Sequence, residues 1–295
     1  MKKLSIIVAG LMASAMLFAQ SNESKVEQNS IDGAVQNKAV VNQTGQENKS
    51  DVLQEIEEGN ASGLNQTNVK QEGKMNTADV DQTMEIWGGS PANKVDVNQK
   101  GQGNAANVKS QAYWGHDVDV IQDGKSNVAT VDVERNGNKT LVKQVGGNVG
   151  GRADQIVTAK GAVVTIEQIS GKSNQAKQTV GTPDFIGSNV LYIKQFEGNS
   201  NMAEQTVNGT EAGAASGNRG DIYQSQGMGN SATQIFDVIG ADKSNPYGNY
   251  AKTTQTGGTG NTAITKQRHS NNEAYQTQVD GGNNYAEIGQ KLGWT

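Results

Sequence analysis

Small, apolar and amide residues alternate with polar or charged residues along most of the chain. In the stretch QEGKMNTADVDQ (71–82), every second residue from position 76 onward belongs to the first kind. Such alternation predicts strands rather than helices, because successive side chains of a strand point to opposite faces. The side chains expected to point inward are Asn76, Ala78, Val80 and Gln82. Those expected to point outward are Thr77, Asp79 and Asp81.

This Asn-led pattern returns about 21 times between residues 22 and 290, which indicates a repeat architecture. One such strand cannot bury its inner face alone, whereas stacked copies can. The pattern predicts an all-β fold, a parallel two-sheet β-solenoid of strand-turn-strand rungs, with about 10 rungs and 21 short strands. One sheet should contain the strands that begin at Asn22, Asn48, Asn76, Asn104 and Asn127. The other should contain those that begin at Asn37, Asn65, Asn93, His116 and Asn138.

Every second connection is short and contains glycine, which supplies the positive φ angles of a tight turn. The expected tight-turn glycines are Gly45, Gly73, Gly101, Gly124 and Gly146. The other connections vary in length, and they contain all three prolines, Pro91, Pro183 and Pro246. Proline cannot donate to an interior ladder, so its placement supports this division into strands and loops.

Stacking at about 4.8 Å per rung would place equivalent residues directly above one another. Side-chain amides can then donate to one neighbour and accept from the other, as in cross-β structures. The expected ladder residues are Gln43, Asn48, Gln54, Gln71, Asn76, Gln82, Gln99, Asn104, Gln122, Asn127, Gln144, Gln168, Asn174, Gln195, Asn201, Gln224, Asn230, Gln255, Asn261, Gln278 and Asn284.

Composition alone would suggest disorder, since only 34% of the residues are hydrophobic and 5% aromatic. The regular alternation argues against disorder, and so does the low number of prolines, three. Amide ladders explain how a core can form from so few apolar residues. The net charge of −5 gives no indication of a nucleic-acid or anionic membrane partner.

The first 20 residues have the features of a secretory signal peptide. Lys2 and Lys3 precede an apolar run that ends in small residues, and cleavage is expected near residue 20. The mature chain, 21–295, is then a single repeat domain with no membrane span, its repeats covering about 22–290. An exported chain with no cysteine has no disulfides, so its stability must come from the fold itself.

These residues resemble the curlin repeat, which reads roughly Gln-x-Gly-x-x-Asn-x-Ala-x-x-x-Gln. QEGKMNTADVDQ (71–82) fits it throughout, and QTGQENKSDVLQ (43–54) fits with serine for alanine. The resemblance implies a secreted subunit that stacks end to end into an extracellular, curli-like amyloid fibre for adhesion and biofilm matrix. It also implies a nucleator subunit and an outer-membrane secretion channel as partners, besides the chain itself. The chain departs from the family in having more repeats, an extra turn residue after 165, and bulky inner Leu191, Ile193 and Phe236.

Candidate chemistry is sparse, and neither catalytic, cofactor-binding nor metal-binding residues are expected. His116 takes an Asn position of the repeat, and His269 falls in a turn. Asp79 and Asp81 share an outward face, where solvated charges are the simpler interpretation, since no pocket would tune their pKa. Trp87 and Trp114 fall in variable loops, where they could bind sugars or a partner, or cap the sheet edge by packing on each other.

The leading hypothesis is therefore a secreted structural fibre subunit that is not an enzyme. Alternatives are a nucleator or minor subunit, a monomeric β-solenoid adhesin, an ice-binding protein and a β-helix polysaccharide hydrolase. Ice binding would need flat outward rows of threonine, which the mixed outward positions lack.

The outward charges also form a pattern, because opposite signs alternate between equivalent positions of successive rungs, where they stabilise the stack. The expected columns are Lys94–Asp117–Lys139, Lys143–Glu167–Lys194 and Asp154–Lys177–Glu204. Asp51 beneath Asp79 is the expected exception.

Overall fold

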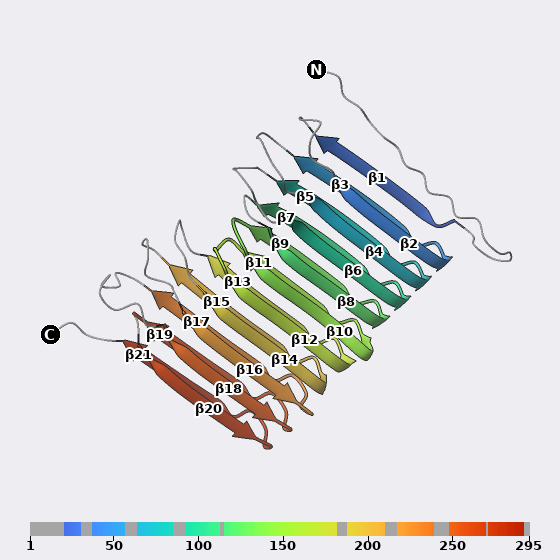
Figure 1. Ribbon diagram of the computed structural model, residues 1–295. Helices are drawn as coiled ribbons and strands as arrows, with labels where there is room; N and C mark the ends of the chain where they lie inside the picture. Colours follow the sequence, from blue (N-terminus) through green and yellow to red (C-terminus); the bar gives the residue numbers. More distant parts are fainter. Residues whose placement is uncertain are drawn as a thin grey trace.

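The computed structural model describes residues 21–30, 37–56, 64–84, 92–112, 115–181, 188–209, 217–238, 248–269 and 271–291. These residues form 21 strands and no helix, in two parallel sheets (Figure 1). The 11-stranded sheet contains β1 (Glu23–Ser30), β3 (Lys49–Ile56), β5 (Thr77–Met84), β7 (Ala105–Ala112), β9 (Val128–Glu134), β11 (Arg152–Val157), β13 (Gln175–Gly181), β15 (Met202–Gly209), β17 (Ser231–Val238), β19 (Thr262–Arg268) and β21 (Tyr285–Lys291). The 10-stranded sheet contains β2 (Lys38–Gln46), β4 (Asn65–Lys74), β6 (Asn93–Gln102), β8 (Asp117–Lys125), β10 (Lys139–Val149), β12 (Val163–Lys172), β14 (Val190–Asn199), β16 (Arg219–Ser225), β18 (Tyr250–Thr256) and β20 (Glu273–Val279).

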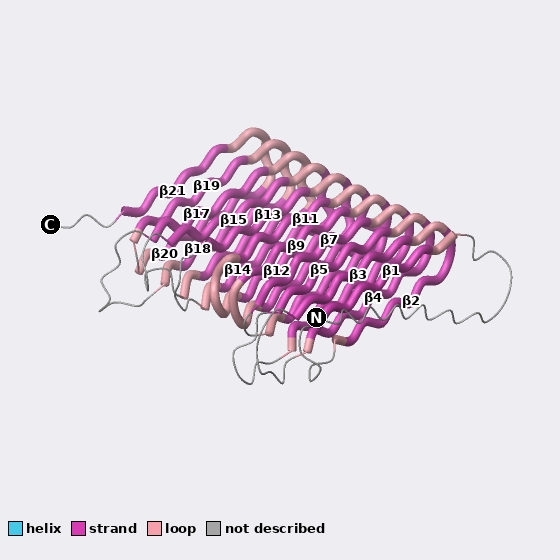
Figure 2. The backbone as a smooth tube through the Cα atoms, turned by 90° about the horizontal axis from the view of Figure 1, so that it is seen from above, coloured by secondary structure: helices cyan, strands magenta, loops and turns pink. Residues whose placement is uncertain are grey.

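Consecutive strands alternate between the two sheets, and each strand pairs in parallel with the strands two before and two after it. The prediction of a parallel two-sheet β-solenoid is therefore confirmed, as is the assignment of the first ten strands to their sheets. The short turns follow one another along one edge of the stack in Figure 2. The two terminal strands, β1 and β21, lie at opposite ends (Figure 1).

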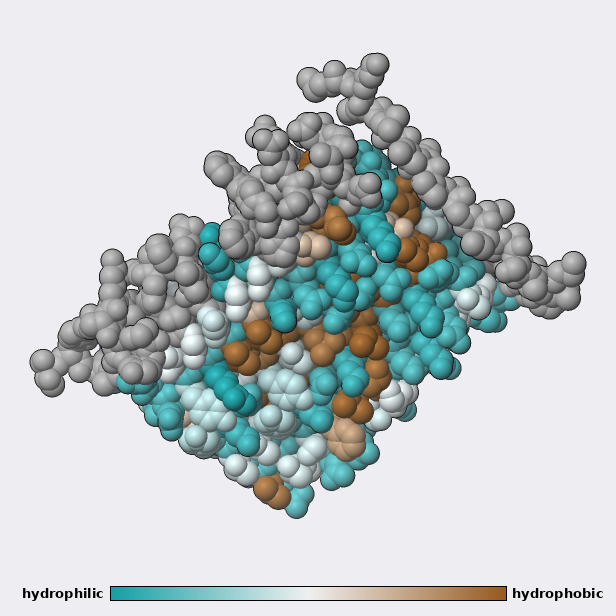
Figure 3. Space-filling view, viewed as in Figure 1, coloured by the Kyte–Doolittle hydropathy of each residue, from teal (hydrophilic) through white to brown (hydrophobic). Residues whose placement is uncertain are grey.

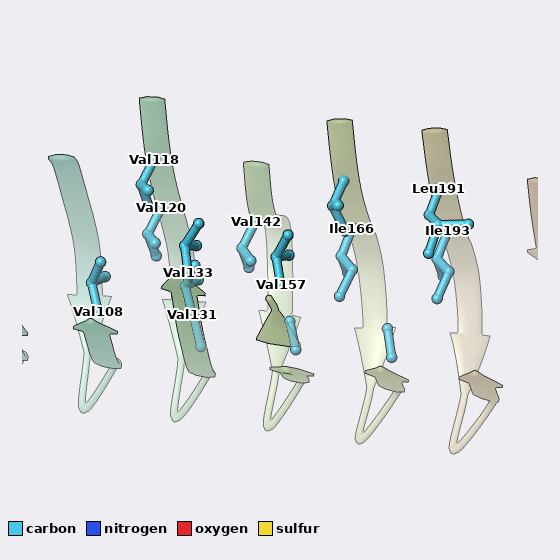
Figure 4. Packing of buried hydrophobic residues seen from close by; sticks show 14 of the residues in the cluster. Val108, Val118, Val120, Val131, Val133, Val142, Val157, Ile166, Leu191 and Ile193 are labelled. Atoms are coloured by element: carbon cyan, nitrogen blue, oxygen red, sulfur yellow. The ribbon is translucent and has the colours of Figure 1, made fainter. Parts of the chain in front are cut away.

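The core lies between the sheets and consists mainly of valine, alanine and amide side chains. Ala78, Val80 and Gln82 are buried, whereas Thr77 and Asp79 are exposed, so the predicted register is confirmed. Figure 4 shows buried valine, isoleucine and leucine side chains from successive strands filling the space between the sheets. The outer face seen in Figure 3 is largely hydrophilic, with apolar residues gathered in a band across its middle.

The core accommodates its bulky inner residues where a neighbouring side chain is small or absent. Leu191, Ile193 and Phe236 are all buried. A Cβ atom built on Gly220 would lie 3.0 Å from the Phe236 ring and 2.8 Å from the Gln234 side-chain oxygen. The absence of a side chain at Gly220 therefore makes room for Phe236 between the sheets.

The tight turns stack as closely as the strands. Gly45, Gly73, Gly101 and Gly124 have positive φ, and a Cβ atom on the first two would lie 2.0 Å from the carbonyl oxygen of the next turn glycine. Only glycine fits such an approach. Gly146 differs, because a register shift within β10 places Asn148 rather than Gly146 opposite Gly124. Gly146 has φ of 75° and belongs to that irregularity.

Several predictions fall outside the described residues, including the signal peptide, the three prolines, Trp87 and Trp114. Within the described part of the chain, no helix is long and apolar enough to cross a membrane.

Candidate functional site

An uninterrupted glutamine ladder runs through the 10-stranded sheet. Each strand contributes one buried or half-buried glutamine, and each Nε2 donates to the Oε1 of the next at 2.7–2.9 Å. The members are Gln43, Gln71, Gln99, Gln122, Gln144, Gln168, Gln195, Gln224, Gln255 and Gln278. All donors point toward the C-terminal end of the stack, so the ladder has a direction.

The second hydrogen of each amide ties the two sheets together. Gln99 donates to the Thr77 carbonyl at 2.8 Å, across the core. Gln224 donates to the carbonyls of Met202 at 2.9 Å and Asn230 at 3.1 Å, which begin β15 and directly precede β17, successive strands of the other sheet. Strands of the 10-stranded sheet therefore lie at heights between those of the 11-stranded sheet.

The 11-stranded sheet contains three separate glutamine ladders. Gln28, Gln54 and Gln82 form the first, and Gln267 and Gln290 form the last. The middle ladder lies between these two in the stack, and its glutamines occupy a position two residues earlier in each strand. Its hydrogen-bonded members are Gln155, Gln178, Gln205 and Gln234. Valine occupies the vacated column, for example where Val157 pairs with Val180. This middle ladder is not among the expected ladder residues, although the spacing of Asn174, Ala176 and Gln178 indicates it.

Each interior ladder begins with an acceptor that has no donor. The Oε1 atoms of Gln155 and Gln267 are buried and unpaired, because Val131 and Phe236 precede them in their columns. A glutamine ladder that starts inside the stack thus leaves one unsatisfied oxygen. The same kind of acceptor at the end of the stack is open to a further strand.

In the asparagine columns, a bond from the backbone N–H is added to the expected amide-to-amide bond. The Asn48 Oδ1 accepts from the backbone N–H of Asn76 at 3.1 Å, and also from its side chain at 3.1 Å. The Asn48 Nδ2 donates to the Gly73 carbonyl at 3.1 Å, so each asparagine also holds the next tight turn. Of the expected asparagines, Asn284 alone is exposed, and the buried ones are Asn48, Asn76, Asn104, Asn127, Asn174, Asn201, Asn230 and Asn261.

Because the donor is the backbone, a different residue can follow an asparagine. The N–H of Ala162 donates to Asn138 at 2.8 Å, and the N–H of Gly151 donates to Asn127 at 3.1 Å. The N–H of His116 likewise donates to Asn93 at 2.8 Å, as its position in the repeat predicts.

His116 is 1% exposed and is held as the neutral imidazole. Its Nε2 faces the Arg135 carbonyl, which only accepts, so the proton lies on Nε2. The Nδ1 then accepts from the Ser110 hydroxyl at 3.0 Å. Burial lowers the pKa of His116 to about 4. This arrangement is structural, with both ring nitrogens occupied by the fold.

The outer charges stand in the predicted columns. Asp117 pairs in register with Lys94 and Lys139, and the Lys94 ammonium lies 3.6 Å from the Asp117 carboxylate. Glu167 lies 4.0 Å from both Lys143 and Lys194.

The third column and the predicted exception also have their expected registers. Lys177 lies 3.5 Å from Glu204, whereas Asp154 is bonded to Arg152 at 2.7 Å instead. Asp51 pairs with Asp79, and burial, followed by this like charge, raises the pKa of Asp79.

A tyrosine cluster on the outer face of the 10-stranded sheet was not expected from the sequence. Tyr192 and Tyr223 have ring centroids 5.5 Å apart, and Tyr250 donates to Asp221 at 3.3 Å. Asp221 faces outward but is only 3% exposed, because Arg219 and Tyr250 contact it. Such contacts strengthen pairing between neighbouring strands.

Among the described strands, the first and the last of each sheet have one edge without a paired strand. At the N-terminal end these are β1 and β2, and at the C-terminal end β20 and β21. The ladder direction leaves the oxygens of Gln28 and Gln43 facing out of the first end. The amide nitrogens of Gln278 and Gln290 are the last donors at the second. The two ends are therefore complementary in their hydrogen-bonding groups.

Among the described residues, no group of three or more histidine, cysteine, aspartate or glutamate side chains could hold a metal ion. Comparison with family models and with curated proteins finds no match.

Proposed function

We propose that the mature chain is a secreted structural subunit of an extracellular, curlin-like amyloid fibre, built from about ten strand-turn-strand rungs. The observation that carries the proposal is the pair of complementary open ends. An unpaired parallel edge is a template for another chain, and proteins that remain monomeric usually cover or charge such edges. Here the described end strands continue the same ladders as the interior.

The mechanism is templated addition of one copy to the end of another. The incoming end strands satisfy the backbone groups of the exposed edges, and the glutamine donors of one copy meet the glutamine acceptors of the next. In this proposal the signal peptide directs export, an outer-membrane channel releases the chain, and a nucleator provides the first template. The resulting fibre serves adhesion and biofilm matrix.

The direct test is incubation of the purified mature chain, followed by electron microscopy and thioflavin fluorescence. We expect unbranched fibres whose growth is accelerated by preformed seeds. Protein that stays monomeric at high concentration would contradict the proposal.

A matched pair of variants tests whether the ladder ends drive addition. Gln43→Leu removes the terminal acceptor of the unbroken ladder, so we expect it to slow elongation at least several-fold. Asn42→Leu places the same side chain on the exposed outer face of the same strand and should elongate like the parent. Equal rates for the two variants would show that the ladder end has no role.

A further inference from the structure

The two sheets contain different numbers of strands, 11 and 10. The strands also alternate in height, as the bonds from Gln278 to the carbonyls of Thr262 in β19 and Asn284 before β21 show. β20 therefore lies at a height between β19 and β21. If the alternation continues, the next strand beyond β21 belongs to the sheet of β20, not to the sheet of β21.

A second copy added by simple translation would not fill this height. Its β1 would pair with β21, and its β2 would then be separated from β20 by the width of one missing strand. Both facing edges of the 10-stranded sheet would keep unpaired N–H and C=O groups. A strand in the sheet of β20 is needed at that level.

We propose that successive copies are related by a half-turn about the stacking axis, an inference that rests on the proposed fibre function. The β1 strand of the next copy pairs with β20, and its β2 pairs with β21. Strand direction is preserved, because the strands of the two sheets run in opposite senses, as their arrows show (Figure 1). Every strand edge is then paired, and both sheets continue across the junction.

The inner residues of the end strands fit this exchange of sheets. In all four end strands, glutamine stands six residues after the asparagine, as Gln28, Gln43, Gln278 and Gln290. The half-turn places Gln28 of the next copy on Gln278 and Gln43 of the next copy on Gln290, so both ladders continue. Strands β13, β15 and β17 have their glutamine two residues earlier and could not be exchanged in this way.

One outer contact favours the opposite arrangement. Translation would bring Lys25 of the next copy beside Glu287, whereas the half-turn brings Glu23 of the next copy beside Glu273. Both contacts are between exposed side chains, where ion pairs contribute little. The free-energy cost of two unpaired strand edges is larger than the gain from one exposed ion pair.

Paired cysteine substitutions distinguish the two arrangements, because the chain has no cysteine of its own. Under the half-turn, Lys25 of one copy lies beside Tyr275 of its neighbour, and under translation it lies beside Glu287. Fibres of the double variant Lys25→Cys and Tyr275→Cys should give covalent multimers with a short bis-maleimide. Fibres of the matched Lys25→Cys and Glu287→Cys variant should give at least ten-fold fewer. The reverse result, or crosslinking in neither, would overturn the half-turn.

Fibres of the unaltered chain provide a test free of assembly defects. With 21 strands shared between two sheets, each copy advances about 50 Å along the axis. Cryo-electron microscopy should then show a rotation near a half-turn for each such advance, superimposed on the fibre's gradual twist. A repeat without that rotation would overturn the inference while leaving the fibre function intact. Absence of fibres would instead contradict the proposed function, and the half-turn with it.

Discussion

The two sheets achieve the same stacking with different columns of amides. In the 10-stranded sheet, glutamine follows glutamine at every level from Gln43 to Gln278, whereas the asparagine column is interrupted at His116 and Ala162. In the 11-stranded sheet, the asparagine column has a single replacement, Gly151, among its described levels, and the glutamine column is divided into three.

The difference follows from the donors that each column uses. An asparagine oxygen accepts from the next backbone N–H, which every residue except proline has. A level that loses its asparagine therefore still donates to the asparagine before it, although it no longer accepts from the level after it. A glutamine oxygen accepts from the next side-chain amide, so a replacement leaves a buried group unpaired. The 11-stranded sheet avoids part of this loss by moving the whole ladder two residues along the strand and filling the vacated column with valine.

The largest expected effect comes from breaking the continuous ladder. Gln144→Leu leaves the Oε1 of Gln168 without its donor and the Nε2 of Gln122 without its acceptor, at about 1–3 kcal/mol for each group. Gln155→Leu in the other sheet removes an acceptor that is already unpaired, so Gln178 is the one glutamine that loses a ladder partner. Urea unfolding of the soluble chain should show a clearly larger loss for Gln144→Leu. Equal losses would contradict the distinction between the two columns.

The histidine that interrupts an asparagine column should make the fold acid-sensitive. His116 has an ordinary pKa of 6.5 when unfolded and about 4 when folded, so the unfolded chain binds more protons between these values. Its contribution to stability is complete above pH 6.5 and falls as the pH approaches 4, by about 3 kcal/mol in total. His116→Asn should remove this component of the pH dependence. An unchanged difference in stability between pH 7 and pH 4 would contradict the assignment.

A smaller effect should follow from filling the space beside the bulky core residue. Gly220→Ala would place a methyl group 3.0 Å from Phe236 and closer still to two glutamine amides. We expect a loss of about 1–3 kcal/mol in the free energy of unfolding. Gly289→Ala is the control, since a Cβ atom there meets nothing within 4 Å. Comparable melting temperatures for the two variants would show that the core relaxes around Gly220.

The smallest expected effect concerns the outer charges. Asp117→Lys would place three lysines in one column and should destabilise the fold by about 0.2–1 kcal/mol at low salt. The loss should shrink as added salt screens the charges. Asp79→Lys is the converse change, because it replaces the like charge beside Asp51 and keeps the Lys25–Asp51 ion pair, and it should stabilise the fold. If both variants changed the free energy of unfolding in the same direction, the charge columns would have no role in stability.

Sequence alone predicts the register, the two sheets and the outer columns, because each depends only on counting residues between asparagines. It does not predict the directions of hydrogen bonds. Both Asn48 and Gln54 follow the same repeat, yet the Asn48 oxygen accepts from a backbone N–H as well as from a side chain, whereas the Gln54 oxygen accepts from a side chain. That choice depends on side-chain length, which decides how far each amide reaches from its own strand. The position of Gly146 could not be predicted because the irregularity in β10 changes which turn residue stacks.

The direction of the long glutamine ladder has an electrical consequence. Each amide dipole has its positive end toward the C-terminal end of the stack, so ten aligned amides act together as a helix macrodipole does. A fibre of such copies would be a polar filament with a weakly positive tip and a weakly negative one. Anions and carboxylate-bearing peptides should prefer the first tip and cations the second, giving the two ends different growth rates and different inhibitors.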